Sequence, residues 1–235
     1  MTKAANISQK SAPGSPRDAI VEALLELAGE RHWEDIPLSD IAARANVSLS
    51  TFREFFPSKG AVLSAFMRKI DKKVLDEAPP PKLDQPPKDR LFEVLVRRLE
   101  VLKPYRPGLE SIGEWSLRDP FAASALNREA MNSMRFMLEA AGIDSEGPIG
   151  MFKLQGLALA WRRVLGTWFT DDSSDLTETK AVLERELARG SAVLARVEDV
   201  GRLTSPLFSI ARSFLDRRRG TGLHEADKEE TPTTF

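Results

Sequence analysis

The stretch that decides the fold is LSDIAARANVSLSTFREFFPSK, residues 38–59. Ser39 stands where it can cap a short helix, because a serine hydroxyl accepts a free amide of the first helical turn. Asn46 stands where that helix must end, since asparagine tolerates the left-handed backbone of a helix C-terminus. Ser48 then caps a second helix, which Pro57 ends. The pattern predicts a helix, a tight turn and a second helix, which is the geometry that places a helix in the major groove of DNA.

Apolar residues on both sides of the turn predict a small packed module. A helix over residues 18–30 should precede the pair, and a helix from Ser58 to about Glu77 should follow it. The apolar positions expected to pack in this module are Ile20, Leu24, Leu27, Ile41, Ala42, Ala45, Val47, Phe52, Phe55, Phe56, Val62, Leu63, Phe66 and Ile70. Their spacing of three and four residues is that of helix faces.

This segment resembles the DNA-binding domain of the TetR (tetracycline-repressor) family of bacterial transcription regulators. The resemblance rests on residues 41–42, 45–48, 50–52 and 56–59, followed by Leu63. Two positions differ from the family pattern. Asn46 stands where the family favours Gly, and Arg53 stands where it usually has a phosphate-contacting Tyr. Since arginine also binds phosphate, the resemblance implies a TetR-type DNA-binding regulator, expected to act as a repressor on a palindromic operator in double-stranded DNA.

The residues expected to contact DNA lie on the two short helices and just beyond them. They are Ser39, Arg44, Ser48, Ser50, Thr51, Arg53 and Lys59. Arg44 and Lys59 are expected to hold phosphates, which position a protein on DNA, whereas base edges supply specificity. Charge alone does not favour DNA, because residues 15–76 contain nine Lys or Arg and ten Asp or Glu and phosphate neutralisation dominates affinity.

The amino-acid composition argues against several classes of function. The chain has no cysteine and only two histidines, His32 and His224, so neither thiol chemistry nor a histidine metal site is expected. No glycine-rich phosphate loop is visible, no apolar run reaches the ~18 residues of a membrane span, and the N-terminus lacks the apolar core of a signal peptide. We therefore expect a cytoplasmic protein that is not an enzyme and needs no cofactor or metal.

Proline divides the chain. Residues 78–88, APPPKLDQPPK, have the composition of an extended linker. The remainder shows helical periodicity, with helices expected over residues 89–102, 109–118, 120–140, 147–170, 175–200 and 205–217. The predicted organisation is all-α. It has a disordered arm (1–14), a three-helix helix-turn-helix module (15–77), the linker (78–88), a helical bundle for ligand binding and dimerisation (89–218), and a disordered tail (219–235).

Large, adaptable side chains suggest a pocket in the bundle. The predicted ligand-binding residues are Trp115, Met134, Met137, Gln155, Trp161 and Arg162. Methionine-rich linings accept varied ligands, and the polar members would orient a small hydrophobic or anionic molecule. The alternative is that these side chains are ordinary core.

Two apolar seams near the C-terminus suit antiparallel helix packing. Their predicted dimer-interface residues are Leu165, Trp168, Leu183, Leu187, Gly190 and Leu194. The TetR resemblance implies that the corresponding helices form a homodimer, which a palindromic operator requires. The alternative is that the seams serve only the core of one chain.

A second, fainter resemblance competes with the first. Residues 176–197, the apolar body and the weakly basic N-terminal module are similar to the lipid-binding accessory proteins of ubiquinone biosynthesis, which look like TetR-type proteins without DNA binding. A lipid-binding protein has no need of Ser50, Thr51, Arg53 and Lys59, so the recognition helix favours the regulator. A dimeric scaffold without ligand is a third alternative.

Overall fold

The structure is a computed structural model that describes residues 14–196. Within that range it is all-helical and contains no strand, as predicted. The helices are α1 (Pro16–Glu30), α2 (Leu38–Arg44), α3 (Leu49–Phe55), α4 (Lys59–Glu77), α5 (Pro87–Leu102), α6 (Arg106–Arg118), α7 (Pro120–Ala140) and α8 (Gly147–Trp168), with short 3₁₀ turns at Trp33–Asp35 and Lys103–Tyr105. The described residues of a further helix are 177–196. The predicted arm over residues 1–13, the helix at 205–217 and the tail lie outside the described residues.

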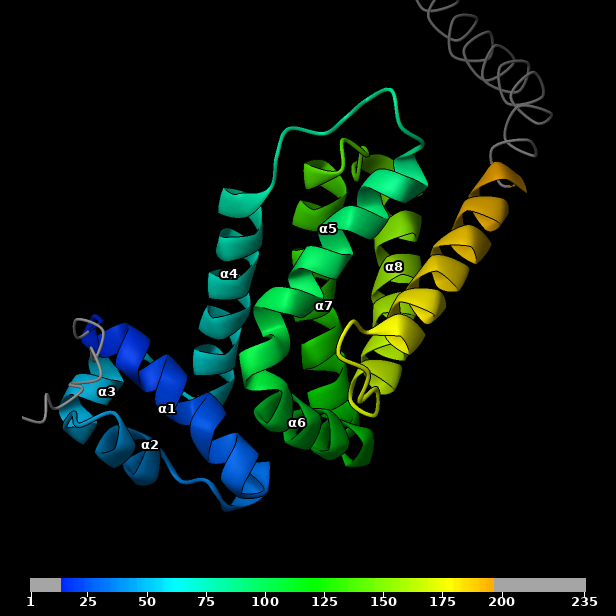
Figure 1. Ribbon diagram of the computed structural model, residues 1–235. Coiled ribbons are helices and arrows are strands. Elements are labelled where there is room, and N and C mark those ends of the chain that lie inside the picture. The colour runs from blue at the N-terminus through cyan, green and yellow to red at the C-terminus, as the bar shows by residue number, and fades with distance from the viewer. Residues whose placement is uncertain (1–13, 197–235) are drawn as a thin grey trace, which may run out of the picture. The chain divides into compact units, whose positions relative to one another are not determined.

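Helices α1, α2 and α3 form the N-terminal module (Figure 1). Ser48 caps α3 by accepting the Thr51 amide at 3.0 Å, and Ser58 caps α4 by accepting the Ala61 amide at 3.2 Å. Asn46 has φ of 54°, in the left-handed region. Its amide donates to the Ala43 carbonyl and the Val47 amide donates to the Ala42 carbonyl, which closes the end of α2 in the pattern of a Schellman cap. These three predicted helix ends are confirmed.

Two local predictions in this module are wrong. Ser39 does not cap α2, because Pro37 supplies the cap position and its carbonyl accepts the amides of Asp40 and Ile41. The helix therefore starts two residues earlier than expected, and Ser39 is a residue of its first turn. Phe55, expected on the packed side of α3, is 40% exposed, whereas Phe52 and Phe56 are buried.

Helix α4 leads from this module towards the rest of the chain (Figure 1). Its apolar side is buried as predicted, through Val62, Leu63, Phe66 and Ile70. It packs on α1, α5 and α7. After α4, the predicted linker is free of helix from Ala78 to Pro86, because its prolines cannot donate helical hydrogen bonds.

Helices α5, α7 and α8 run side by side in the body (Figure 1), with α6 below them near α1. Two predicted boundaries shift. The helix expected from residue 109 begins at Arg106, since Pro107 fits the first turn, where its missing amide costs nothing. The helix expected from residue 89 begins at Pro87 for the same reason. Asp119 caps α7 by accepting the Phe121 amide at 2.8 Å, as predicted.

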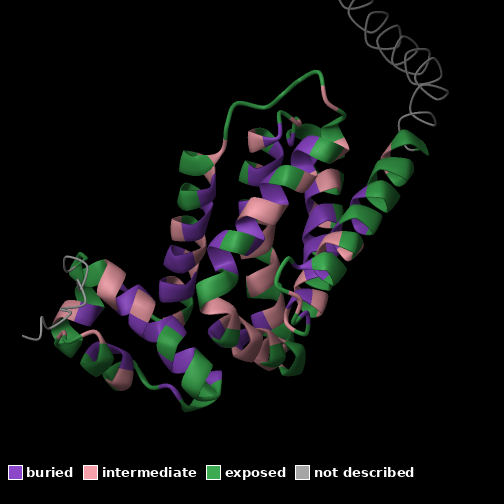
Figure 2. Cartoon of the chain, in the orientation of Figure 1, coloured by how far each residue is buried: buried purple, intermediate pink, exposed green. Residues whose placement is uncertain are grey.

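Buried residues line the inner faces of all these helices (Figure 2). They form one cluster that extends from Ile20 in α1 to Leu187 in the helix that starts at residue 177. Residues up to 188 form one compact unit, and residues 189–196 belong to a second unit. Among the residues described, each helix is too short or too polar to cross a membrane.

Candidate functional site

The start of α3 presents a cluster of hydroxyl groups. Ser48 Oγ lies 2.7 Å from Ser50 Oγ and 3.0 Å from Thr51 Oγ1, so the helix cap also orients the two following polar side chains. Ser48, Ser50 and the neighbouring Leu49 are exposed, and Thr51 is half-buried. Hydroxyl groups and an apolar side chain at this position can meet base edges and the thymine methyl group.

Arg53 is the cation of α3 that remains available. It is exposed, and no described residue pairs with it. A guanidinium in this state can bind a phosphate oxygen without first leaving an internal partner. The predicted residues Ser48, Ser50, Thr51 and Arg53 are therefore brought together on one short helix.

Arg44 and Lys59, predicted to hold phosphates, are engaged within the chain instead. Arg44 makes two hydrogen bonds to Glu30, at 2.8 and 2.7 Å, and one to Glu26 at 3.3 Å. These bonds raise the pKa of Arg44 and lower the pKa of Glu30. Lys59 donates to the Trp33 carbonyl at 2.7 Å and lies 4.9 Å from the centre of the Trp33 ring. Burial lowers its pKa. Both side chains therefore stabilise the packing of the N-terminal module. Ser39, another predicted DNA contact, is exposed, and its hydroxyl lies 3.4 Å from Asp40 Oδ1.

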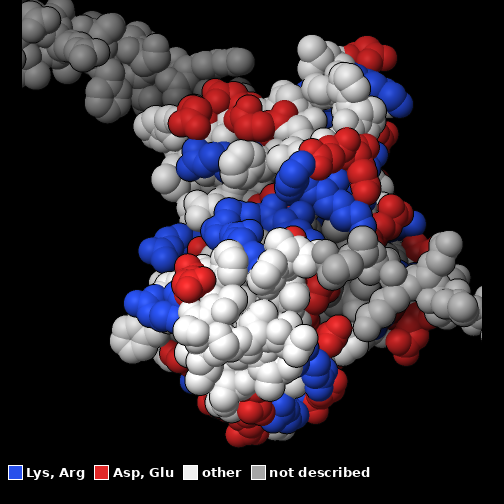
Figure 3. Space-filling model, turned by 90° about the vertical axis from the view of Figure 1, so that its left-hand side faces the viewer, with Lys and Arg blue, Asp and Glu red and all other residues white. Residues whose placement is uncertain are grey.

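Figure 3 views the side of the molecule on which α3 lies, where charged side chains of both signs surround a central uncharged area. An uncharged area lies below a band of basic side chains. Three cations of α4, Arg68, Lys72 and Lys73, are exposed. The fourth, Lys69, pairs with Glu22 of α1 at 2.8 Å.

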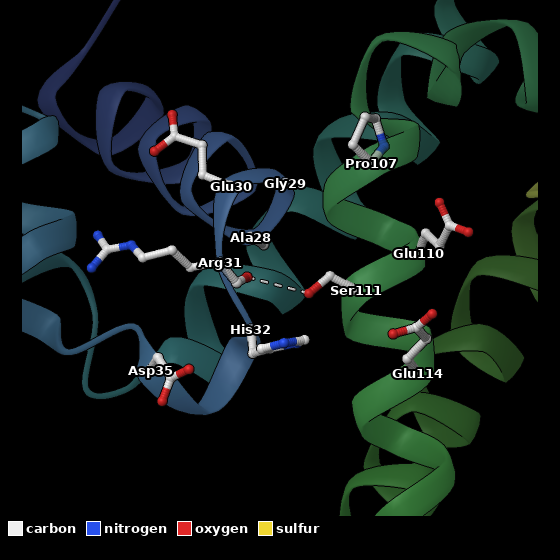
Figure 4. Close-up of a pocket in the computed structure, with 10 residues that line it drawn as sticks. All are labelled: Ala28, Gly29, Glu30, Arg31, His32, Asp35, Pro107, Glu110, Ser111 and Glu114. Carbon is white, nitrogen blue, oxygen red and sulfur yellow. Dashed lines mark hydrogen bonds between the residues drawn. The ribbon is translucent and has the colours of Figure 1, made fainter.

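A cleft of about 490 Å³ lies between the end of α1 and the side of α6 (Figure 4). It is lined by Ala28, Gly29, Glu30, Arg31, His32, Asp35, Pro107, Glu110, Ser111 and Glu114. Ser111 Oγ donates to the Arg31 carbonyl at 3.4 Å across it. The lining is polar and rich in carboxylates, and it contains none of the residues predicted to bind a ligand.

The predicted ligand residues separate into three environments. Met134, Met137 and Trp161 are buried in the core of the body. Trp115 is half-buried on α6 and stacks on Trp33, with ring centres 5.1 Å apart, so it joins the core near the N-terminal module. Gln155 is half-buried and accepts from Asn127 at 3.5 Å, whereas Arg162 is exposed. The expectation that Arg162 faces an internal pocket is wrong, because its helical position points it outward.

The predicted dimer residues are mostly internal. Trp168, Leu183 and Leu187 are buried within a single chain, and Leu165 is half-buried against the same core. Within one chain these side chains pack in the core, as the monomer-core alternative expects. Gly190 is exposed and Leu194 half-buried in the second unit.

Sequence reasoning missed a buried ion pair at the centre of the body. Arg98 of α5 is 0% exposed and donates through Nη1 to Asp71 Oδ1 of α4. Ser133 of α7 donates to the other oxygen of Asp71 at 2.8 Å. Burial lowers the pKa of Arg98, and the charge of Asp71 opposes that shift. A signal was present, since Arg98 follows Leu91, Val94 and Leu95 at helical spacing and so falls on the apolar side of α5.

Comparisons with known proteins identify the class. No protein-family model matches the chain, and no curated protein matches it. Among solved structures, a TetR transcriptional regulator from Nitrosomonas europaea is 25% identical, covers 76% of this chain and 99% of its own, and superposes with a TM-score of 0.60. A TetR regulator from Rhodococcus sp. RHA1 is 23% identical over 74% of this chain and 95% of its own, with a TM-score of 0.55. A TetR-family regulator from Streptomyces coelicolor is 15% identical over 88% and 97%, with a TM-score of 0.54.

The chain thus has the fold of TetR-type transcriptional regulators, and the resemblance predicted from residues 38–59 is confirmed. The predicted all-α class is confirmed with it. The similar structures are regulators, which agrees with the expectation that the chain is not an enzyme.

Proposed function

We propose that this protein is a cytoplasmic, homodimeric repressor that binds a palindromic operator through α3 and responds to a small hydrophobic or anionic ligand. The observation that carries the proposal is the capped recognition helix. Ser48, Ser50, Thr51 and Arg53 lie together on α3, and Arg53 has no internal partner among the described residues. The similarity to TetR regulators supports it.

In this proposal, the side chains of α3 divide the work of recognition. Arg53 holds a phosphate and sets the register of the helix in the major groove. Ser50 and Thr51 donate to or accept from base edges, and the exposed Leu49 contacts a thymine methyl group. Arg44 and Lys59 act indirectly, because their bonds to Glu30 and to the Trp33 carbonyl hold α1, α2 and α4 around α3.

We propose that dimerisation uses the outer face of α8 rather than the buried residues. Ile149, Phe152 and Leu159 are 46%, 49% and 42% exposed on α8. Gly156 lies between them, and Gly166 lies seven residues after Leu159. A methyl group added at either glycine would meet nothing within 4 Å. Ile149, Phe152, Gly156 and Leu159 are spaced by three, four and three residues, so they lie along one seam of α8. Glycine in this seam allows a partner helix to approach closely.

The experiment is a selection of genomic fragments by the purified full-length protein. Random fragments of the source genome are bound, washed at physiological salt and sequenced. The proposal expects a few enriched fragments that share an inverted repeat, with half-site centres 10–10.5 base pairs or a multiple apart, as a two-fold dimer requires. Enrichment should be lost with Arg53→Ala and kept with Arg118→Ala, an exposed arginine on α6, away from both α3 and the α8 seam. A selection without any enriched motif would overturn the proposal.

One observation favours the alternative of a lipid-binding accessory protein without DNA binding. The N-terminal module exposes Leu38, Leu49 and Phe55, and two of its predicted phosphate contacts are internally paired. The same protein preparation distinguishes the two functions. Organic extraction followed by mass spectrometry should yield a stoichiometric isoprenoid or fatty lipid if the alternative holds, together with an empty fragment selection.

A further inference from the structure

The guanidinium of Arg98 has hydrogen-bond donors that the protein does not satisfy. Its Nη1 donates to Asp71 and lies 3.9 Å from the Met137 sulfur. Its Nε and Nη2 are buried and have no hydrogen-bond partner. Buried N–H groups are nearly always paired in proteins, so two on one charged side chain indicate a place where another molecule belongs.

Arg90, on the same helix, shows what a purely structural buried arginine looks like here. Its Nε donates to the Ala141 carbonyl at 2.7 Å, its Nη1 to the Gln85 carbonyl at 2.5 Å, and its Nη2 to the Gly142 carbonyl at 3.4 Å. Every nitrogen of that guanidinium has a backbone carbonyl partner: two carbonyls just after α7 and one in the segment before α5. Arg98 differs because Nε and Nη2, which form one edge of its guanidinium, have no hydrogen-bond partner. We call this edge the open edge.

The open edge specifies the chemistry of its partner. Nε–H and Nη2–H point the same way, so together they match the two oxygens of one carboxylate. The Trp161 ring lies 5.8 Å from the centre of the Arg98 guanidinium, and Met137 contacts it. Met134 is buried nearby in the same core. An indole face and flexible thioethers suit the apolar body of a ligand.

We propose that Arg98 is the anchor of the effector site and that the effector is a hydrophobic monocarboxylate bound in bidentate fashion to Nε and Nη2. This inference rests on the proposed function and names the ligand class of that regulator. It replaces the exposed Arg162, predicted from sequence, as the group that recognises an anion.

The same geometry supplies a route from ligand to DNA. Asp71 belongs to α4, the helix that follows the recognition module, and it is held by Arg98 of α5 and Ser133 of α7. A second carboxylate on Arg98 competes with Asp71 for the same positive charge, which weakens the attachment of α4 to the body. An effector acts only through such a difference in affinity between two states.

The test uses the full-length protein without DNA, so that its outcome is independent of the fragment selection. The probes are benzoate, 1-naphthoate and octanoate, each compared with its neutral amide. Binding is followed by tryptophan fluorescence, which includes Trp161, and by the unfolding temperature. We expect at least one carboxylate to bind at least tenfold more tightly than its amide.

Two variants locate the site. Arg98→Lys keeps the charge that Asp71 requires but removes the two-pronged edge, and it should weaken the carboxylate at least tenfold. Arg162→Lys should leave binding unchanged. Equal affinity for acids and amides, or no binding by any of the three acids, would overturn the proposal. These wild-type comparisons hold even if Arg98→Lys does not fold. A failed ligand test with a successful fragment selection would leave the regulator intact and remove only the carboxylate site.

Discussion

Asp71 and Arg98 form a buried ion pair between α4 and α5, and each needs the other to compensate its charge. Removing one partner of a buried ion pair leaves the other charge without compensation, which typically costs about 3–5 kcal/mol. We therefore expect Asp71→Ala to lower the free energy of unfolding by about that amount in denaturant titrations.

The double variant Asp71→Ala/Arg98→Met is the control. It removes both charges and keeps an apolar side chain of similar length, so it should recover most of the lost stability. A double variant that is less stable than Asp71→Ala alone would contradict this account of the pair.

Tyr105 provides a spectroscopic measure of how α1 packs on the start of α6, because it is the only tyrosine of the chain. Its hydroxyl donates to Glu22 at 3.0 Å. Burial, followed by the negative charge of Glu22, raises the pKa of Tyr105 to about 12. In the unfolded chain a tyrosine loses its proton near pH ~10.

Because the pKa of Tyr105 is higher in the folded than in the unfolded chain, its contribution to stability depends on pH. This contribution is complete below pH ~10 and is lost as the pH rises towards the folded pKa. Absorbance at 295 nm should show the phenolate appearing with a midpoint near pH ~12 in the folded protein. Glu22→Gln should lower that midpoint, since the charge is removed. A midpoint near ~10 while circular dichroism still shows the native helix content would contradict the buried environment.

At the level of helices, the close contact between α1 and α6 requires a glycine at position 108. A Cβ atom at Gly108 would lie 2.5 Å from the Leu25 carbonyl oxygen, which is backbone and cannot rotate away. Gly108→Ala should therefore destabilise the protein by about 1–3 kcal/mol through forced separation of the helices, measured by thermal unfolding.

Gly113, on the same helix, is the matched control. A Cβ there would meet only the Phe169 ring at 3.5 Å, an ordinary contact. Gly113→Ala should then stabilise the protein by up to about 1 kcal/mol, because alanine is the better helix former. Equal changes in both variants would show that helix propensity, rather than the close approach to Leu25, decides the effect.

Helix ends show how far the sequence alone predicts this fold. Ser48, Ser58 and Asn46 were predictable because each acts on its own backbone neighbourhood. Ser39 was misplaced because Pro37 can begin the same helix earlier, and two adequate starts cannot be ranked from spacing alone. Phe55 was misplaced because α3 is short, so the side of it that packs depends on α1 rather than on its own periodicity.

The functional site was less predictable for the same physical reason. The residues of α3 are neighbours in sequence and were found together. Whether Arg44 and Lys59 are available depends on Glu30 and the Trp33 carbonyl, which are brought close only by folding. The Arg98–Asp71 pair joins residues 27 positions apart, and nothing local in the sequence marks them as partners.

For the molecule as a whole, apolar residues buried in the core stabilise one chain, whereas exposed apolar residues are available for contact with a second copy. Trp168, Leu183 and Leu187 are buried in the core of one chain, so their periodicity is explained by packing within the monomer. The exposed face of α8 is what remains for a second copy.

We expect light scattering to give twice the 26.1 kDa mass of the chain. Leu159→Glu, which places a charge in the α8 seam, should reduce it to the single-chain mass at micromolar concentration. Leu117→Glu is the control, since Leu117 is exposed on α6 outside the seam, and it should leave the mass unchanged. A dimer that persists in Leu159→Glu would place the interface elsewhere.

Binding of DNA by α3 is best measured by fluorescence anisotropy on a selected genomic fragment and on its scrambled counterpart, over a salt series. We expect tight binding to the selected fragment only, weakening steeply with salt. Arg53→Ala should lower the affinity at least tenfold and reduce the slope of log affinity against log salt by about 1, as for one lost phosphate contact. Arg44→Ala should act mainly through stability. Equal, weak binding to both duplexes, unchanged by Arg53→Ala, would contradict the claim.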